Sequence, residues 1–340
     1  MNLLRLGLAG VGRIGVLHAG NLAALRGDPR LGGDQISLLI SDPDEARGRQ
    51  VAQSLDAGFV PSVGEMLDRG IDGLVIAAGT STHPELIRNG VDAGVPVFCE
   101  KPVALDVTAA LPVVDYVRER GGTVQMGHQR RFDTGYLEAR RRLEAGELGW
   151  IHSFSAVTGD MVPPPVDFLA TSGGLFRDCS VHDFDILRWL TGRSIVEVYA
   201  RGSNNGDPGI GRAGDIDTGL VVVTLDDGTV GTVAATRYNG AGHDVRLELR
   251  GSLSSVTVGL DGRAAVRSAE ADFAMPGQPP YRTFAERFAA AYQAEMLAFA
   301  ELVLGRRDNP CPPEDSVAAS QAADAAQLSL LTGAPVKVGP

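Results

Sequence analysis

Residues 4–15 read LRLGLAGVGRIG, and this stretch decides how the chain begins to fold. An apolar run at 4–9 leads directly into the pattern G-x-G-x-x-G, formed by Gly10, Gly12 and Gly15. These glycines permit a tight turn, a close approach of the backbone to a pyrophosphate, and close packing of a helix on the strand. The N-terminus of that helix attracts the anion. The stretch therefore predicts a dinucleotide-binding unit, and a glycine-rich turn without a ligand is the alternative.

Short apolar runs and helical segments alternate outward from this stretch. Apolar runs lie at 36–40, 73–78, 95–99 and 123–126, and helical patterns begin near residues 12 and 44 and cover 84–93 and 108–120. Such alternation is typical of βαβ units in a parallel sheet. We expect an N-terminal Rossmann domain, a doubly wound parallel α/β sheet, over residues 1–125.

The second part of the chain is rich in β-forming segments. Candidate strands lie at 151–157, 220–225, 229–236, 245–249, 255–258 and 264–267, with turn signals such as Asp226-Asp227-Gly228 between them. Helices are expected at 136–145, 175–190, 284–304 and 316–331, a long loop at 202–219, and an irregular segment at 271–282. Residues 126–340 are therefore predicted to form an α+β substrate-binding and oligomerisation domain with a large open, mostly antiparallel β-sheet flanked by helices.

Composition limits the classes of function. The 340 residues suggest about two domains. A net charge of -11 repels nucleic-acid phosphates and anionic lipids, and no apolar run approaches the roughly 20 residues that a membrane-spanning helix needs. Three cysteines, Cys99, Cys179 and Cys311, lack the paired spacing of a zinc site or disulfide framework. We expect a cytoplasmic protein without an export signal that binds neither nucleic acid nor membrane.

Asp42 ends the second apolar run and is the candidate for recognising the adenosine ribose. A carboxylate there can accept hydrogen bonds from the ribose hydroxyls and would repel a 2′-phosphate, which favours NAD over NADP. The alternative is that Asp42 only begins a turn and caps the next helix. Arg47 and Arg49 lie nearby and leave a mixed cofactor preference open.

Lys101 follows a predicted strand in the sequence Glu100-Lys101-Pro102. This position is at the carboxyl edge of the parallel sheet, where doubly wound folds bind their ligands. A lysine beside a cationic nicotinamide can have a depressed pKa and can hydrogen-bond a substrate hydroxyl or carbonyl. The alternative is a solvated surface charge.

Asp178 and His182 stand four residues apart in the predicted helix 175–190, so their side chains share one face. A carboxylate beside an imidazole holds its tautomer and raises its basicity, and a pKa of about 6.5 suits acceptance of an alcohol proton near neutrality. A structural ion pair is the alternative. Asp183 and Asp185 point in different directions on such a helix, and we predict no metal site.

Together these motifs resemble the Gfo/Idh/MocA family of nicotinamide-dependent sugar and polyol oxidoreductases. Residues 9–15 (AGVGRIG) with His18, 97–102 (VFCEKP) and 127–132 (GHQRRF) carry the general resemblance. A central series then resembles the inositol-oxidising members: Asp160, prolines at 163–165, SGGLFRD at 172–178 and VHDFD at 181–185. The similarity spans nearly the whole chain.

The resemblance implies NAD-dependent oxidation of a ring secondary alcohol, with myo-inositol converted to its 2-keto product as the first expectation. It implies that Lys101, Asp178 and His182 are catalytic. We assign cofactor binding to Gly10, Gly12, Arg13, Ile14, Gly15, Asp42, Thr80, His83, Glu100 and Lys101. Substrate binding is assigned to Lys101, Arg130, Asp160, Asp178, His182 and His243. The family typically pairs open sheet faces, which implies a homodimer or homotetramer.

One segment departs from the family pattern. Residues 241–246 read AGHDVR where the inositol-oxidising members carry a tyrosine-rich segment. Lost aromatic hydroxyls on a sheet near the substrate leave other polyols or sugars open. Fold alone also leaves open an NAD-dependent glycosidase of the same family or a non-catalytic nicotinamide-binding sensor.

Overall fold

The computed structural model describes residues 3–31, 35–169, 172–270 and 277–339. Packing divides the chain into two compact units, residues 1–129 with 290–317 and residues 130–289 with 318–340. Residues 290–317 thus pack with the first unit although they follow the second in sequence. The predicted division at residue 125 does not include this return of the chain. In the described part of the chain, no helix is long and apolar enough to cross a membrane.

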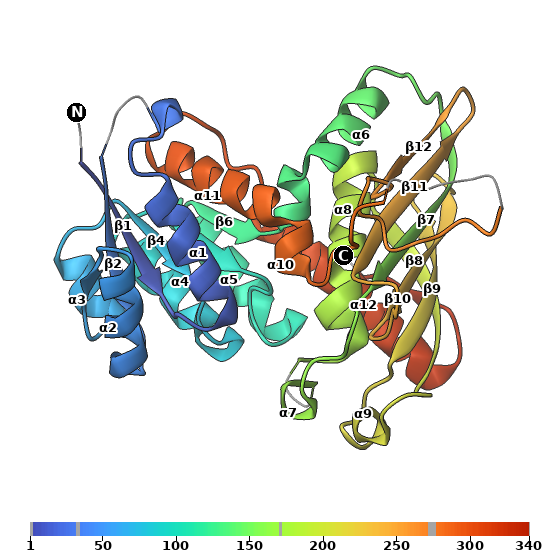
Figure 1. Ribbon diagram of the computed structural model, residues 1–340, viewed down its shortest axis with the longest axis horizontal. Coiled ribbons are helices and arrows are strands. Elements are labelled where there is room, and N and C mark those ends of the chain that lie inside the picture. The colour runs from blue at the N-terminus through green and yellow to red at the C-terminus, as the bar shows by residue number, and fades with distance from the viewer. Residues whose placement is uncertain (1–2, 32–34, 170–171, 271–276, 340) are drawn as a thin grey trace. The chain divides into compact units, whose positions relative to one another are not determined.

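A parallel sheet of six strands forms the centre of the first unit (Figure 1), in the order β3-β2-β1-β4-β5-β6. The strands are β1 (Leu3–Ala9), β2 (Gln35–Ser41), β3 (Gly58–Phe59), β4 (Gly73–Ile76), β5 (Val97–Glu100) and β6 (Val124–Gly127). The chain runs outward from β1 to β3 and then from β4 to β6. The order therefore reverses between β1 and β4, the switch point at which such sheets bind ligands. The predicted Rossmann fold is confirmed.

Helices cover both faces of this sheet. One face packs against α1 (Arg13–Ala24), α2 (Glu45–Ser54) and α11 (Ala289–Val303). The other packs against α3 (Val63–Asp68), α4 (His83–Asp92) and α5 (Val107–Glu119). Neighbouring strand residues alternate between the two cores: Val75 lies in the first and Leu74 in the second, as the period of a strand requires. Two short 3-10 turns, η1 (Pro29–Leu31) and η2 (Thr80–Thr82), complete the unit.

The second unit contains a sheet of seven strands in the order β12-β11-β7-β10-β9-β8-β13. These are β7 (Ile151–Gly159), β8 (Ile195–Ser203), β9 (Thr218–Leu225), β10 (Val230–Thr236), β11 (Asp244–Gly251), β12 (Ser255–Val258) and β13 (Val336–Lys337). Strands β7 and β10 are parallel, and the other pairs are antiparallel. The predicted mostly antiparallel sheet is confirmed.

Helical segments accompany this sheet. They are η3 (Gln129–Phe132), α6 (Thr134–Glu144), α7 (Val166–Leu169), η4 (Phe176–Ser180), α8 (Val181–Thr191), α9 (Pro208–Arg212), α10 (Phe284–Arg287) and α12 (Pro313–Thr332). Helix α8 lies against one face of the sheet (Figure 1), where its buried Phe184 and Leu187 contribute to the core. Late in α12, Ser329 Oγ accepts a hydrogen bond of 2.9 Å from Ala200 N–H of β8.

Several sequence expectations were wrong in detail. The predicted single helix 175–190 is a π-helical turn, η4, followed by α8. The loop expected at 202–219 includes the end of β8, the short helix α9 and the start of β9. Strands β3, β8 and β13 and helix α3 were not anticipated. The two-residue strands β3 and β13 and the six-residue helix α3 give little periodicity, whereas the nine residues of β8 were not recognised as a strand.

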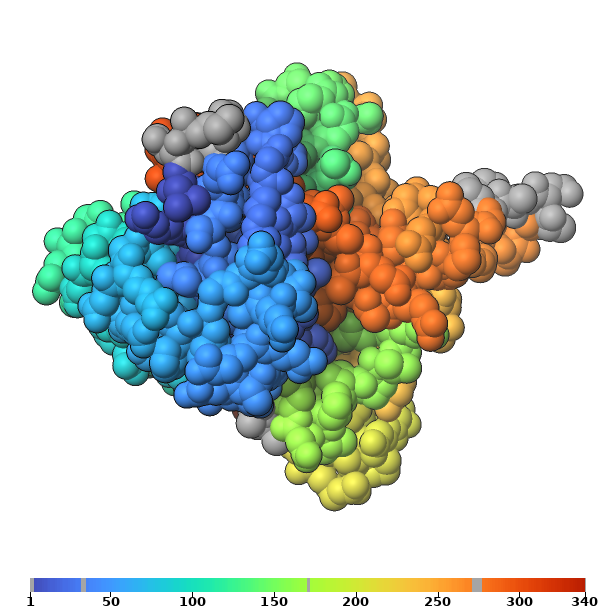
Figure 2. Space-filling view, turned by 60° about the vertical axis from the view of Figure 1, so that its left-hand side comes forward, coloured from blue at the N-terminus to red at the C-terminus, as the bar shows by residue number. Residues whose placement is uncertain are grey.

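Residues 264–267 form no strand, contrary to expectation. Arg267 Nη1 donates to the carbonyl oxygens of Ala264 and Val266, so the local backbone is bonded within the segment rather than to a neighbouring strand. Figure 2 shows the orange chain after β12 projecting from the second unit. Residues 271–276 of the predicted irregular segment lie outside the described residues; 277–282 are irregular, as expected.

Candidate cofactor and substrate sites

Gly10 and Gly15 make the turn after β1 possible. Gly10 has a φ of +91°, and a Cβ there would lie 2.7 Å from Ala78 Cα. A Cβ on Gly15 would lie 2.0 Å from the carbonyl oxygen of Gly10. Helix α1 can therefore begin directly against the end of the strand only because both residues lack side chains.

Gly12, unlike Gly10 and Gly15, has open space around its Cα. It is the N-cap of α1, and a Cβ added to it would meet no atom within 4 Å. No side chain caps this helix, and its first turn carries no acidic residue. Helix N–H groups without intrahelical acceptors and open space beside Gly12 fit a pyrophosphate. Arg13 is exposed and Ile14 half-buried at the same helix start.

Asp42 is 2% exposed and stabilises the turn after β1. Its Oδ2 accepts a hydrogen bond of 2.7 Å from Val11 N–H, and its Oδ1 accepts from Asp44 N–H and from Arg47 Nη2. Burial alone would raise the pKa of Asp42, but these hydrogen bonds outweigh it and lower the pKa. Asp44, not Asp42, caps α2. Asp42 is thus an ionised carboxylate placed beside the glycine turn.

Thr80 and His83 follow β4 at the same edge of the sheet. Thr80 is half-buried in η2. His83 is buried; its Nδ1 lies 2.7 Å from the carbonyl oxygen of Pro102, and its Nε2 lies 3.1 Å from that of Ala78. His83 therefore ties the end of β4 to the segment after Lys101, which favours a positioning role over the predicted cofactor contact.

Glu100 is the last residue of β5, and Lys101 follows it. His18 Nε2 of α1 lies 2.6 Å from Glu100 Oε1, and His18 is fully buried. Possible ligand atoms of His18, Glu100 and the buried Glu295 lie within 4.8 Å of one another. Lys101 itself is half-buried. Sequence reasoning quoted His18 within a motif but gave it no role; the structure makes it the partner of the carboxylate that precedes Lys101.

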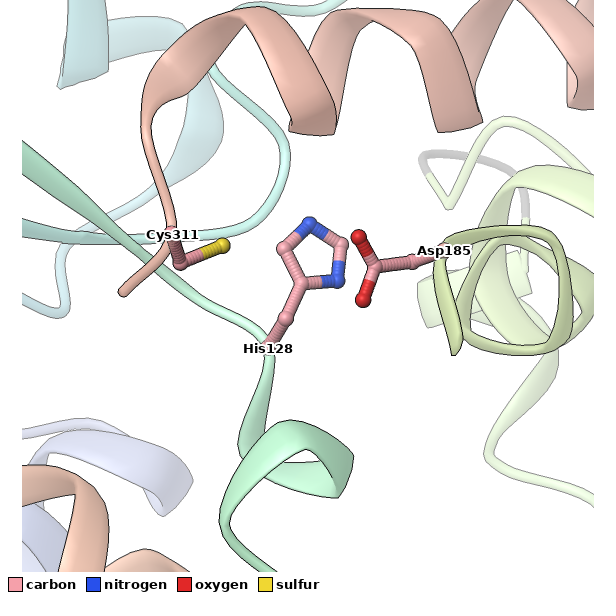
Figure 3. Close-up of side chains that lie close together, drawn as sticks. All are labelled: His128, Asp185 and Cys311. Atoms are coloured by element: carbon pink, nitrogen blue, oxygen red, sulfur yellow. The ribbon is translucent and has the colours of Figure 1, made fainter. Parts of the chain in front are cut away.

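His128 and Cys311 meet after β6 in the first unit, and Figure 3 shows both side chains. His128 Nε2 lies 3.0 Å from Ser316 Oγ. The carbonyl oxygen of Cys311 accepts a hydrogen bond of 2.8 Å from Met126 N–H. These contacts attach the segment between α11 and α12 to the edge strand of the parallel sheet. The prediction that the chain binds no metal stays a prediction.

In the second unit, Asp178 lies in the π-helical turn η4 and His182 is the second residue of α8. Asp178 Oδ2 accepts a hydrogen bond of 3.1 Å from Arg237 Nη1, and its side chain is 21% exposed. His182 is half-buried. Isolated π-helical turns occur often at functional sites. The structure thus places the two predicted catalytic residues on successive turns.

Asp183 and Asp185, which follow the catalytic candidate His182, are buried in ion pairs. Arg130 Nη1 donates to Asp183, and Arg130 Nη2 donates to Thr158 Oγ1 at 2.9 Å. Arg131 donates through Nε to Asp185 Oδ2 at 3.0 Å. With its guanidinium group committed to these partners, Arg130 fits a structural role better than the predicted substrate contact.

Asp160 and His243 lie side by side at one end of the sheet. Asp160 directly follows β7, and His243 directly precedes β11. His243 Nδ1 lies 3.2 Å from Asp160 Oδ1, and Cys179 Sγ lies 3.9 Å from Asp160 Oδ2. Arg237 follows β10 at the same end. The structure therefore gathers Asp160, His243 and the Asp178 turn in the second unit.

Sequence reasoning missed Arg237 and Asp215 in this group. Arg237 Nη2 donates to Asp215 Oδ2 at 2.9 Å. The available signal was position: Arg237 directly follows the predicted strand 229–236. Nothing in the spacing of Asp215 indicates its role.

Comparison with known proteins agrees with this geometry. Residues 4–128 match the model of an oxidoreductase family with an NAD-binding Rossmann fold, and residues 136–257 match that of the GFO/IDH/MocA C-terminal domain. The resemblance inferred from the motifs is therefore confirmed.

Individual relatives match over nearly their full length. Myo-inositol dehydrogenase Hyg17 of Streptomyces leeuwenhoekii is 38% identical over 98% of this chain and 99% of its own. The crystal structure of a myo-inositol dehydrogenase from Corynebacterium glutamicum has a TM-score of 0.88 and 34% identity, and covers 99% of both chains. That of scyllo-inositol dehydrogenase from Lactobacillus casei with bound NAD(H) and scyllo-inositol has a TM-score of 0.87 and 28% identity, with 99% of both chains covered.

The two glycines of the turn give a test of where a dinucleotide binds. We expect Gly12→Ala to weaken NAD binding without lowering the melting temperature, because its Cβ enters open space that a pyrophosphate would use. Gly15→Ala is the matched comparison and should lower the melting temperature, because its Cβ would overlap the Gly10 carbonyl. Calorimetry for NAD and thermal unfolding measure the two effects. Unchanged NAD affinity in the folded Gly12→Ala protein would contradict this placement.

Proposed function

Because the chain belongs to the Gfo/Idh/MocA family of oxidoreductases, we propose that it oxidises a ring secondary alcohol of a cyclic polyol, with myo-inositol as substrate and its 2-keto derivative as product. NAD is the cofactor of this CH–OH oxidoreductase. The observation that carries the proposal is the placement of Asp178 and His182 on successive turns, with Asp178 bonded to the buried Arg237. The relatives named as inositol dehydrogenases support the choice of substrate.

The first unit would hold NAD, which supplies the hydride acceptor when bound. The N–H groups at the start of α1 and the open space at Gly12 would receive the pyrophosphate. Asp42 would accept hydrogen bonds from the ribose hydroxyls. Arg47 already donates to Asp42, so its positive charge is partly balanced and offers less attraction to a 2′-phosphate.

The proton chemistry falls to three side chains. His182 accepts the proton from the hydroxyl that is oxidised, acting as a general base. The Lys101 ammonium stabilises the negative charge that develops on the hydroxyl oxygen. Asp178 stabilises the imidazolium that His182 becomes. Because Arg237 bonds to Asp178 Oδ2, Asp178 serves as a fixed charge and not as a second base.

Asp160 is the proposed contact to the other hydroxyls of the polyol. Its side chain is partly exposed, whereas its partner His243 is buried behind the end of the sheet. A carboxylate accepts hydrogen bonds from two neighbouring hydroxyls with little preference for the rest of the ring. This pair lies in the region where residues 241–246 depart from the family pattern, so it is the place where substrate preference would change.

A panel of polyols tests the function. We expect the absorbance of the reduced cofactor to rise with myo-inositol and NAD, and to rise less when NADP replaces NAD, because Asp42 would disfavour the 2′-phosphate. Other inositols and common aldoses form the comparison set. A higher rate with an aldose would contradict myo-inositol as the substrate but not the proposed oxidation of a secondary alcohol. No NADH with any compound, despite measured NAD binding, would overturn the proposed function.

Two substitutions test the proton chemistry. Lys101→Ala should lower kcat by about 100-fold or more while NAD still binds, because charge stabilisation in the transition state is lost. His182→Ala should remove the dependence of kcat/KM on pH near neutrality, because the group that accepts the proton is gone. Initial rates across pH 6–9 measure both. An active Lys101→Ala protein, or an unchanged pH profile in His182→Ala, would remove that residue from the mechanism.

We further propose that the face of the seven-stranded sheet that carries Leu220 and Val222 pairs with a second copy of this chain. Leu220 and Val222 of β9 are 48% and 43% exposed, and Val230 of β10 is exposed on the next strand. Alternate residues of β9 are buried, so these apolar side chains share the outer face. Contiguous exposed apolar surface of this kind marks an interaction site.

Sedimentation of charged variants tests the pairing. We expect wild-type protein to sediment as a dimer or tetramer, and Leu220→Glu with Val222→Glu to give a smaller species, because two carboxylates would be buried between copies. Leu253→Glu is the control, since Leu253 is 76% exposed in the turn between β11 and β12. A monomeric wild type, or an unchanged double variant, would contradict the pairing.

A further inference from the structure

We propose that Arg237 and Asp215 form a clamp that positions Asp178 for its part in the reaction. In this role Arg237 is a positioning residue that acts through Asp178. The inference rests on the proposed function, because it assumes that Asp178 supports proton transfer by His182. Its structural part, the fixing of the turn that carries Asp178, can be measured without any activity.

The contacts of the clamp are all within the second unit. Arg237 has no exposed side-chain surface. Its Nη1 lies 3.1 Å from Asp178 Oδ2, and its Nη2 lies 2.9 Å from Asp215 Oδ2. Asp215 Oδ1 accepts a hydrogen bond of 2.9 Å from Leu175 N–H. One guanidinium and one carboxylate therefore hold both the start of η4 and the side chain in its middle.

Local sequence brings the turn to the clamp. Gly173 and Gly174 have φ values of +80° and +92°, and a Cβ on Gly174 would lie 3.3 Å from Asp215 Oδ1. These two glycines direct Leu175 N–H towards the carboxylate. The buried side chains of Leu175 and Cys179 then pack with Ala235 of β10.

Backbone contacts fix the other side of the clamp. Arg237 N–H donates to the carbonyl oxygen of Asp217 at 2.7 Å, and this bond lies just beyond the paired ends of β9 and β10. Asp215 precedes β9 by a short segment. The guanidinium is thus anchored to the sheet through its own backbone, and η4 is anchored to the guanidinium.

Exposure separates the roles of the two carboxylates. Asp215 is 4% exposed, whereas Asp178 is 21% exposed. Burial alone would lower the pKa of Arg237, but the neighbouring Cys179, Asp178 and Asp215 outweigh it and raise the pKa, so the guanidinium stays charged. The buried carboxylate balances that charge, and the partly exposed one is left at the surface of the turn. Asp178 contacts Arg237 through its Oδ2.

The clamp explains how a π-helical turn serves the site. A π-helical turn is rarer than an α-helical one, so its presence at residues 176–180 points to support from outside the helix. Here Asp215 and Arg237 supply it at two points of η4. Because α8 continues directly from η4, the direction of His182 also follows from this attachment. Loss of the clamp would let Asp178 turn away while the rest of the unit stays folded.

A double-mutant cycle distinguishes positioning from simple structural support. Arg237→Lys keeps the charge but cannot bond both carboxylates in the same way. We expect it to lower kcat with the best polyol by about tenfold in the native background and by less than about twofold in the Asp178→Asn background, with KM for NAD unchanged. An equal fall in both backgrounds would show that Arg237 does not act through Asp178, and would overturn the proposal.

Hydrogen exchange of the turn gives a readout without substrate. Asp215→Asn retains the size of the side chain but removes the charge that balances Arg237, so it should lower the melting temperature. If Asp215→Asn does not fold, the exchange is measured in Arg237→Lys, which keeps both charges. We expect faster exchange of the amides of residues 175–180 in Asp215→Asn than in wild type. Unchanged exchange there would overturn the clamp, whereas a wild-type protein that oxidises no polyol would overturn the proposed function alone.

Arg193→Lys is the matched control for both measurements. Arg193 lies just after α8 and forms an exposed ion pair of 3.3 Å with Asp227. Exposed pairs contribute little to stability. The same substitution there should leave kcat and the exchange of residues 175–180 at wild-type values. A comparable loss at Arg193 would mean that any arginine change in this unit disturbs the turn, and would contradict a specific clamp.

Discussion

The burial of three guanidinium groups is the constraint on which the second unit depends. Each is bonded to a buried aspartate, in the pairs Arg130 with Asp183, Arg131 with Asp185, and Arg237 with Asp215. Removing one member of a buried pair typically costs about 3–5 kcal/mol, because the remaining charge is left without compensation. Two of the pairs attach α8 to η3, and the third joins the end of β10 to the segment before β9. The position of His182, at the start of α8, therefore depends on the first two pairs.

In this arrangement, neighbouring residues of α8 have different roles: some attach the helix, and one is the proposed general base. Asp183 and Asp185 hold α8 through Arg130 and Arg131, and neither is left for a substrate. His182, beside them in sequence, is half-buried. Successive residues of a helix point in different directions, so one short segment can be anchored on one side and present an imidazole on another. The first unit works differently: there the absence of side chains at Gly10, Gly12 and Gly15 makes the turn and the open helix start.

The sequence predicted the features that depend on local signals and missed those that depend on contacts between distant residues. The glycine turn and the parallel sheet depend on local signals, namely which residues lack a Cβ and where apolar runs recur, so they were predicted correctly. Arg237 and Asp215 join residues from different parts of the chain, and no spacing indicates such a contact. The sequence also could not show that Arg130 would bond to the buried carboxylate of Asp183. Asp178 and His182 stand four residues apart in the sequence whether the segment forms an α-helix or a π-helical turn. The π-helical turn η4 therefore could not be predicted from this spacing.

The separation also bears on how substrate preference can differ within one family. Asp160 and His243 are bonded to each other and belong to none of the three buried arginine pairs. A change at residues 241–246 therefore alters the hydroxyls that the proposed site can bind without removing the charge that balances Arg237. Because Asp178 is held from η4 and β10 rather than from β11, the proton chemistry can remain constant while the contacts to the rest of the ring vary. The carboxylate that balances Arg237 and the carboxylate proposed to contact the rest of the ring are therefore different residues at the same end of the sheet.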